Sequence, residues 1–238
     1  MINNFETIEK FLQFEEGTFY KFELLIRNTD GNNVLYENGY SNTNKNILIK
    51  SWYVDNNEYL QKIKNEMITM ANLTGARLYV TLDRKDNVKL VQSLIKSYTD
   101  SLCAICNGQK PSIKNIAKTF ASETSKVENS SKTTKTIMFD VDTKSMYVTK
   151  AVREYIESKG VQCHVLETKK GYHMFCYRKF SHQDWELAIK TNLHGQLYKV
   201  MEHDIELEIG KYLDIKQYVC VKENELGLVY HPEKNNEC

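Results

Sequence analysis

Apolar residues recur along the chain with two alternating periods, and the switches between these periods mark the expected elements. Apolar positions three or four residues apart predict helices over residues 5–14, 57–73 and 87–106. Alternating or continuous apolar runs predict strands over residues 18–26, 47–54 and 76–82. The polar run Asn-Thr-Asp-Gly-Asn-Asn at residues 28–33 predicts a turn. The first half of the chain is therefore expected to form an α+β lobe.

The second half repeats this alternation in a fixed order. A strand over residues 137–142 is followed by a helical period that ends near Gly160, and then by strands over residues 163–167 and 172–177. A second helix is expected over residues 183–201, and either residues 218–221 or residues 226–230 supply the last strand. This βαββαβ order predicts a ferredoxin-like unit, in which we expect the first and third strands to lie side by side and parallel.

A polar stretch without periodicity, residues 122–135, separates these two halves and predicts a loop or linker. We therefore expect an N-terminal α+β lobe over residues 1–121 and a second half over residues 136–238. Close packing between the halves would still make them one domain.

The strand over residues 137–142 ends in two carboxylates. Asp140 and Asp142 are two residues apart, so both side chains should leave the strand on one face, at its exposed end. His173 lies on a later strand, and we expect it on the same open face of the sheet. Lys169, Lys170 and Gly171 form the turn before it. The set predicts a site for a metal-bound polyphosphate, with Mg²⁺ or Mn²⁺ held by Asp140 and Asp142.

Each of these residues also has an ordinary structural explanation. Acids at the end of a strand often cap the next helix, a histidine can be buried and hydrogen-bonded, and lysines at a turn are usually solvated. Arg77 begins a predicted strand and Arg84 follows it, and each could bind a phosphate bidentately or remain on the surface.

Composition restricts the partners and the compartment. The 32 Lys and Arg against 31 Asp and Glu give a net charge of +1, so any basic surface for nucleic acid must be local. No signal peptide is visible and no run approaches the roughly 20 apolar residues of a membrane span, which predicts a cytoplasmic protein without membrane contact. The six cysteines lack the spacing of a disulfide framework. Cys103 and Cys106 have zinc-like spacing without a second pair, and they could equally face a core.

Two motifs of the second half resemble signatures of the archaeo-eukaryotic primase superfamily. The run Phe139-Asp140-Val141-Asp142 matches its Asp-x-Asp strand, and Thr168-Lys169-Lys170-Gly171-Tyr172-His173 matches its small residue, glycine and histidine on a following strand. The whole chain is also similar in layout to uncharacterised phage proteins. The resemblance implies an RRM-like catalytic half of the kind found in the primase small subunit, and a host cytoplasm as the compartment if the protein is phage-encoded.

The resemblance implies a metal-dependent nucleotidyltransferase that uses an NTP or dNTP on a DNA or RNA primer-template. It implies that Asp140, Asp142 and His173 are the catalytic residues. The residues expected to contact the nucleotide or its phosphates are Thr168, Lys169, Lys170, Gly171, Arg77, Arg84 and Arg178.

The third signature of the superfamily is an acid on a later strand, and this chain departs from it. The matching strand, residues 218–221, carries Cys220 at that position; other sources of an acid are Asp214, Glu206 and Glu208. Without a third carboxylate, the expectation becomes a phage protein that binds nucleotides or nucleic acid without catalysis. A further alternative is a haloacid-dehalogenase-like phosphatase with Asp140 as nucleophile. Thr143-Lys144 stands where that class usually has Gly-Thr, which counts against it.

Overall fold

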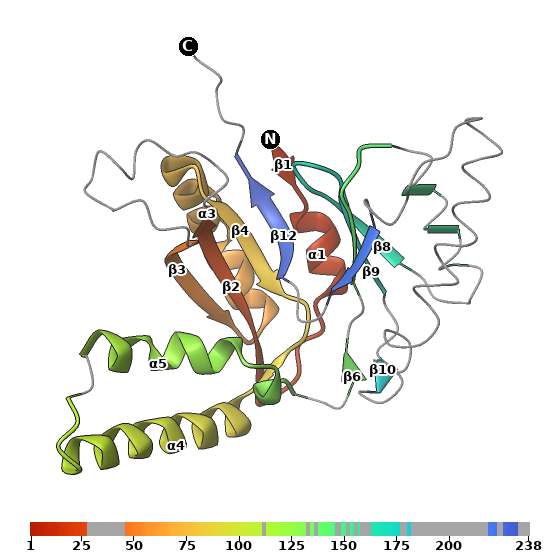
Figure 1. Cartoon of the computed structure of the whole chain (residues 1–238). Helices are drawn as coiled ribbons and strands as arrows, with labels where there is room; N and C mark the ends of the chain where they lie inside the picture. Colours follow the sequence, from red (N-terminus) through yellow and green to blue (C-terminus); the bar gives the residue numbers. More distant parts are fainter. Residues whose placement is uncertain are drawn as a thin grey trace.

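The computed structural model describes residues 1–27, 46–110, 113–131, 134–135, 138–145, 149–150, 153–154, 157, 163–176, 180–181, 219–222 and 226–232. These residues form the α+β structure that the sequence predicts, and the sheets are antiparallel (Figure 1). The helices are α1 (Phe5–Phe11), α3 (Asn57–Thr74), α4 (Asn87–Cys106), α5 (Ile113–Ser125) and the short 3₁₀ helix η2 (Val127–Asn129). None of the described helices combines the length and apolar character that a membrane crossing requires.

The larger sheet has the strand order β1-β12-β4-β2-β3, and β5 pairs with the end of β2. Its strands are β1 (Ile2–Asn3), β12 (Leu226–His231), β4 (Arg77–Thr81), β2 (Thr18–Ile26), β3 (Ile47–Val54) and β5 (Lys85–Asp86). All of these pairs are antiparallel. β12 comes from the expected second half of the chain, yet it completes the sheet of the first half.

The smaller sheet has the order β11-β7-β9-β8. Its strands are β7 (Met138–Val141), β8 (Cys163–Glu167), β9 (Tyr172–Cys176) and β11 (Val219–Lys222). The expected neighbours β7 and β9 do lie side by side, but they are antiparallel, so the prediction of a parallel pair is wrong. The reason is that β7 and β8 run in the same direction, and the tight turn between β8 and β9 reverses the chain, so that β9 is antiparallel to both of its neighbours. A separate two-stranded pair joins β6 (Thr134–Lys135) and β10 (Phe180–Ser181).

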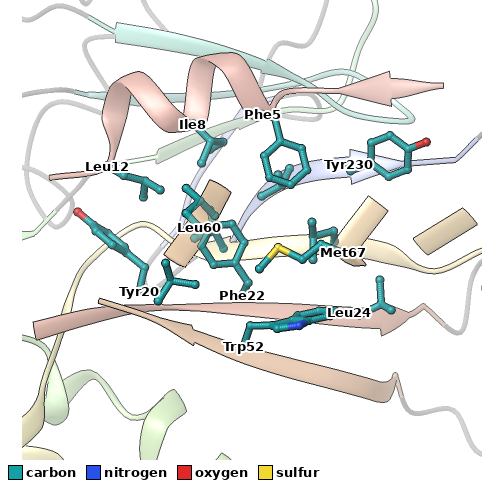
Figure 2. Packing of buried hydrophobic residues seen from close by; sticks show 14 of the residues in the cluster. Phe5, Ile8, Leu12, Tyr20, Phe22, Leu24, Trp52, Leu60, Met67 and Tyr230 are labelled. Atoms are coloured by element: carbon teal, nitrogen blue, oxygen red, sulfur yellow. The ribbon is translucent and has the colours of Figure 1, made fainter. Parts of the chain in front are cut away.

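One hydrophobic core joins the two sheets through α1. Figure 2 shows side chains of α1, β2 and α3 directed toward one another, with Phe22, Leu60 and Met67 at the centre. All three are fully buried. The smaller sheet adds Phe175, whose ring meets Phe11 edge to face with 4.6 Å between the ring centroids. Shared burial of this kind fixes the position of the second sheet on the first.

Asn4 connects the two sheets through hydrogen bonds to the backbone. Its side-chain amide donates to the carbonyl oxygens of Glu167 at 3.0 Å and Leu228 at 2.9 Å, and its oxygen accepts from the Glu167 N–H at 3.3 Å. The residue is buried, so these backbone groups have little access to water. Asn4 thereby holds the end of β8 against β12.

The other face of β2 packs against α5. Lys21 is fully buried there; it pairs with Glu23 and donates to the Ala121 carbonyl at 3.3 Å and to Ser125 Oγ at 3.0 Å.

The expectation of a loop over residues 122–135 is wrong at its start, because this stretch contains the end of α5 and η2. Four of its polar residues are buried in the fold, namely Glu123, Thr124, Asn129 and Ser130. Helix α5 itself was not predicted, although Ile113, Ile116, Ala117 and Phe120 recur at helical intervals.

Glu123 on α5 is the acid most strongly shifted by this packing. It accepts hydrogen bonds from Ser93 Oγ and from Ser97 Oγ at 2.7 Å, and it pairs with Lys126 Nζ at 2.8 Å. Burial alone would raise the pKa of Glu123, but the hydrogen bonds from Lys126, Ser93 and Ser97 outweigh it and lower this pKa to about 2. The carboxylate therefore fixes α5 to α4 only while it is ionised.

Lowering the pH should remove the stabilisation that the ionised carboxylate of Glu123 gives to the fold. A carboxyl group whose pKa is lower in the folded state stabilises above its unfolded pKa, and the stabilisation disappears as the pH falls toward the folded pKa. Between about pH 4.5 and pH 2 we expect the wild type to lose up to about 2 kcal/mol more stability than Glu123→Gln. Urea unfolding of both proteins across this range measures the difference, and parallel stability curves would contradict the assignment.

Several expected elements lie wholly or partly outside the described residues. The helix over residues 183–201 is one of these, as is most of the helix after Asp142. Of the latter, the described residues Thr149, Lys150, Arg153, Glu154 and Glu157 are helical.

Candidate functional site

A cavity of about 260 Å³ lies where the two sheets meet, and it collects most of the residues predicted for the site. The residues that line it are Arg27, Arg77, Tyr79, Asp140, Asp142, Thr168, Lys169, Lys170, His173 and Leu228. The larger sheet supplies the two arginines, Tyr79 and Leu228, and the smaller sheet with its β8–β9 turn supplies the others. Residues far apart in the sequence are thus brought to one place by the contact between the sheets.

The prediction that Asp140 and His173 lie on neighbouring strands is confirmed. They are directly paired between β7 and β9, and His173 Nε2 lies 3.4 Å from Asp140 Oδ1. Asp140 is only 7% exposed, so the expectation that both carboxylates sit at an exposed strand end holds for Asp142 alone. The face itself is not open, because Phe175 on the same side of β9 is covered by α1.

The turn between β8 and β9 presses against the end of β7. Thr168 N–H donates to the Gly171 carbonyl at 2.9 Å, and Gly171 N–H donates to Thr168 Oγ1 at 3.1 Å. A Cβ atom on Gly171 would lie 1.8 Å from the carbonyl oxygen of Val141. Only glycine permits this approach, which holds Lys169 and Lys170 beside the Asp pair. Gly171 itself does not line the cavity.

Arg27 and Tyr79 are cavity residues that sequence reasoning missed. Arg27 follows β2, and its guanidinium carbon lies 5.2 Å from the centre of the Tyr79 ring, within cation–π distance. Arg77, which was predicted, is paired with Leu25 two residues before Arg27. The available signal was the position of Arg27 between a predicted strand and a strong turn signal, but nothing in the local sequence indicates which part of the larger sheet lies near Asp140.

Two buried polar atoms at this cavity lack hydrogen-bond partners among the described residues. They are Nε of Arg27 and Nδ1 of His173. Buried donors and acceptors are nearly always satisfied in folded proteins, and an exception calls for a specific explanation such as a bound ion or ligand. Both atoms belong to side chains that can bind an anion, because Arg27 is cationic and a histidine nitrogen can donate a hydrogen bond.

The charge of the lining favours a ligand that is an anion overall. Arg27, Arg77, Lys169 and Lys170 carry four positive charges, against two carboxylates. A polyphosphate keeps a negative charge after binding one divalent cation, so it matches both parts of this lining. A volume near 260 Å³ is below the roughly 300–1,000 Å³ of pockets that enclose a whole small molecule. The cavity is therefore suited to the phosphate part of a nucleotide.

Asp140 and Asp142 are the residues that could hold a divalent metal. The described residues contain no group of three or more His, Cys, Asp or Glu side chains arranged around a common metal position. Mg²⁺ is usually bound by one or two carboxylates, with water and substrate phosphates supplying the other ligands. The two acids beside a cationic phosphate site fit that pattern, whereas they do not make a cage that binds metal without a phosphate.

β11 lies on the opposite side of β7 from β9. Its register aligns Cys220 with Asp140, so the strand expected to carry a third acid has a cysteine at the paired position. The other expected sources, Asp214, Glu206 and Glu208, lie outside the described residues.

Other predicted residues are placed away from the cavity. Arg84 donates to the Gln13 carbonyl at 2.8 Å and pairs with Glu15 at 3.0 Å, and it does not line the cavity. Arg178 lies outside the described residues. Cys103 and Cys106 are free and exposed on α4, so the expectation that they face a core is wrong, and no described histidine or cysteine completes a zinc site with them.

No protein-family model, curated protein or solved structure matches this chain. The functional conclusion therefore rests on the geometry and chemistry of the cavity.

Proposed function

We propose that the cavity binds the triphosphate of a nucleotide together with Mg²⁺ or Mn²⁺, and that the protein is a nucleotidyltransferase of the primase–polymerase type. The observation that carries this proposal is the single cavity lined by Asp140, Asp142, His173 and four cationic side chains. The β11-β7-β9-β8 order supports it, because this order is that of a ferredoxin-like or RRM-like sheet built from a βαββαβ chain. The resemblance of the two motifs to primases supports the same assignment.

Each group has a separate task in the proposed reaction. Lys169, Lys170 and the two arginines hold phosphate oxygens, and His173 donates a hydrogen bond to the triphosphate. Asp140 and Asp142 would hold the metal ion, which supplies neutralisation of the phosphate charge during in-line attack. The attacking group is the 3′-hydroxyl of a DNA or RNA primer, which forms a phosphodiester bond with the α-phosphorus and displaces pyrophosphate.

Titration of the purified protein with an NTP and a dNTP, each with and without Mn²⁺, tests the binding part of this proposal. We expect Mn²⁺ to tighten binding of the triphosphate at least about tenfold, because the metal neutralises the repulsion between phosphate and carboxylates. The matched nucleoside, which has no phosphate, should bind weakly and without dependence on Mn²⁺. Equal affinity for nucleoside and triphosphate would refute a phosphate site. Extension of a labelled primer on a template then tests the transferase activity.

The second candidate function is binding of nucleotide or nucleic acid without nucleotidyl transfer. It is favoured by Cys220 opposite Asp140, because two-metal phosphoryl transfer needs enough anionic ligands to hold both ions. In this case the protein binds nucleotide or nucleic acid, the titration gives the same Mn²⁺ effect, and the primer is not extended.

Substitution of Cys220 by Asp separates these two candidates. A carboxylate at this position should tighten Mg²⁺ binding roughly tenfold and raise any primer extension, because hard cations prefer carboxylate oxygen to a thiol. Mg²⁺ titration and primer extension are compared between the wild type and Cys220→Asp. Weaker function in the variant would mean that another acid already completes the site, and an unchanged variant would mean that position 220 does not reach it.

A further inference from the structure

Helix α4 carries a stripe of exposed apolar side chains that belongs neither to the hydrophobic core nor to the lining of the cavity. Of the eleven large apolar side chains exposed in the described part of the chain, six lie on α4. They are Val88, Val91, Ile95, Tyr98, Leu102 and Ile105, with exposed fractions from 39% to 65%. Apolar surface concentrated in this way on one face of one helix is typical of a binding surface.

The spacing of this stripe is that of a coiled-coil seam. Its residues follow one another at intervals of three and four residues in strict alternation, which keeps an apolar line facing a partner helix over 18 residues. Helix α4 is long enough for this, since it spans 20 residues and is capped by Asp86, whose carboxylate accepts from the Lys89 N–H at 2.9 Å. The pattern therefore predicts that the partner is another α-helix.

The opposite face of α4 is already occupied by α5. Leu90 is buried there, and Ser93 and Ser97 donate to Glu123 of α5. Figure 1 shows α4 along the outer side of the hairpin that it forms with α5. The described residues thus account for the inner face of α4 and leave the stripe uncovered.

The residues beside the stripe favour a second copy of the same chain. Coiled coils choose different partners mainly through charges at the positions that flank the seam. On α4 these flanking positions are Asn87, Gln92, Leu94, Thr99, Ser101 and Cys106, and none of them is charged. An identical helix therefore meets no like-charge repulsion, and a two-fold axis lets the stripe bind to itself.

The area of the stripe is sufficient for such a dimer. Each of the six side chains leaves roughly 100 Å² uncovered, which is on the order of 600 Å² per chain and about 1,200 Å² for two chains. Stable specific interfaces begin at about this size before flanking residues are included. We propose that the protein dimerises through α4, by packing this stripe against the same stripe of a second copy.

Sedimentation velocity from about 1 to 100 μM chain tests the proposal over the affinity range of stable dimers. A reducing agent is kept present, because Cys103 and Cys106 are exposed thiols that could crosslink chains by oxidation. We expect the wild type to sediment at twice the mass of one chain. The double variant Ile95→Lys with Leu102→Lys should sediment as a monomer, with a dissociation constant at least about 100-fold higher.

Leu73→Lys is the matched control, because Leu73 is an exposed leucine, 81% accessible, on α3 instead of α4. This variant should remain dimeric. If the double variant loses its helical circular dichroism, the single variant Val91→Glu provides the readout in its place. A wild type that is monomeric throughout the range, or a dimer that persists with lysines or a glutamate in the stripe, would overturn the proposal.

Discussion

Asp140→Asn is expected to abolish the Mn²⁺-dependent part of nucleotide binding, with a loss of about 100-fold or more in affinity measured with Mn²⁺ present. The substitution keeps the size of the side chain and removes the charge that would hold the metal beside His173 Nε2, which lies 3.4 Å from Oδ1 of Asp140. Metal-free binding should be retained or tighten, because the cationic side chains of the cavity remain and one carboxylate that repels the phosphate is removed. Isothermal titration with and without Mn²⁺ measures both quantities.

Two further variants interpret this result. Asp142→Asn should give a similar loss, since Asp142 lines the same cavity, whereas Asp55→Asn changes an exposed acid that does not line it and should bind as the wild type does. Asp140 is buried, so its variant also needs a urea unfolding curve to show that the fold is retained. Mn²⁺-dependent affinity that survives in both cavity variants would rule out the metal role of the Asp pair.

Gly171→Ala is expected to have the largest effect on stability. Its added methyl group would lie 1.8 Å from the Val141 carbonyl oxygen, 2.7 Å from Thr143 N and 2.9 Å from Thr143 O. All three are backbone atoms that cannot move aside without separating the turn from β7, so we expect a loss of about 3 kcal/mol or more. Lys169 and Lys170 would move with the turn, and triphosphate affinity should fall as well. Urea unfolding and nucleotide titration test the two effects.

Gly17→Ala is the control that distinguishes steric crowding of the added methyl group, expected in Gly171→Ala, from the general cost of replacing a glycine. Gly17 has a φ of 74°, which disfavours alanine, but a Cβ atom there meets nothing within 4 Å. This variant should lose roughly 1 kcal/mol through its backbone alone. A Gly171→Ala protein no less stable than Gly17→Ala would contradict the steric argument.

Local patterns predicted the elements of the smaller sheet well, because each carries its own signal. The Asp140 strand, the tight turn at Gly171 and the strand of His173 could be read from period changes and turn residues, and their pairing follows once the turn is known. The direction of β9 relative to β7 was predicted incorrectly, although it follows from the turn before Tyr172 and from the shared direction of β7 and β8. The strands themselves were therefore predicted correctly, and only the relative direction of β7 and β9 was wrong.

Contacts between segments that are distant in the sequence could not be predicted from local sequence patterns. Arg27 and Tyr79 line the cavity only because β2 and β4 of the larger sheet lie near the smaller sheet, and no local period encodes that arrangement. Arg84 is similar in chemistry to Arg77 and follows β4 by three residues, but its contacts with Glu15 and Gln13 hold it away from the cavity. The buried Lys21 and Glu123 also look like surface charges until α5 is placed over β2.

The position of β12 between β1 and β4 has a consequence for the order in which the protein can fold during synthesis. Asn4 leaves the ribosome 163 residues before its partner Glu167 and 224 residues before its partner Leu228. The larger sheet therefore cannot close while the chain is being extended, and β4 presents an unpaired edge to other nascent strands until residues 226–231 emerge. Leu228 also lines the cavity, so the lining of the cavity is complete only after this residue has been made, 201 residues later than Arg27.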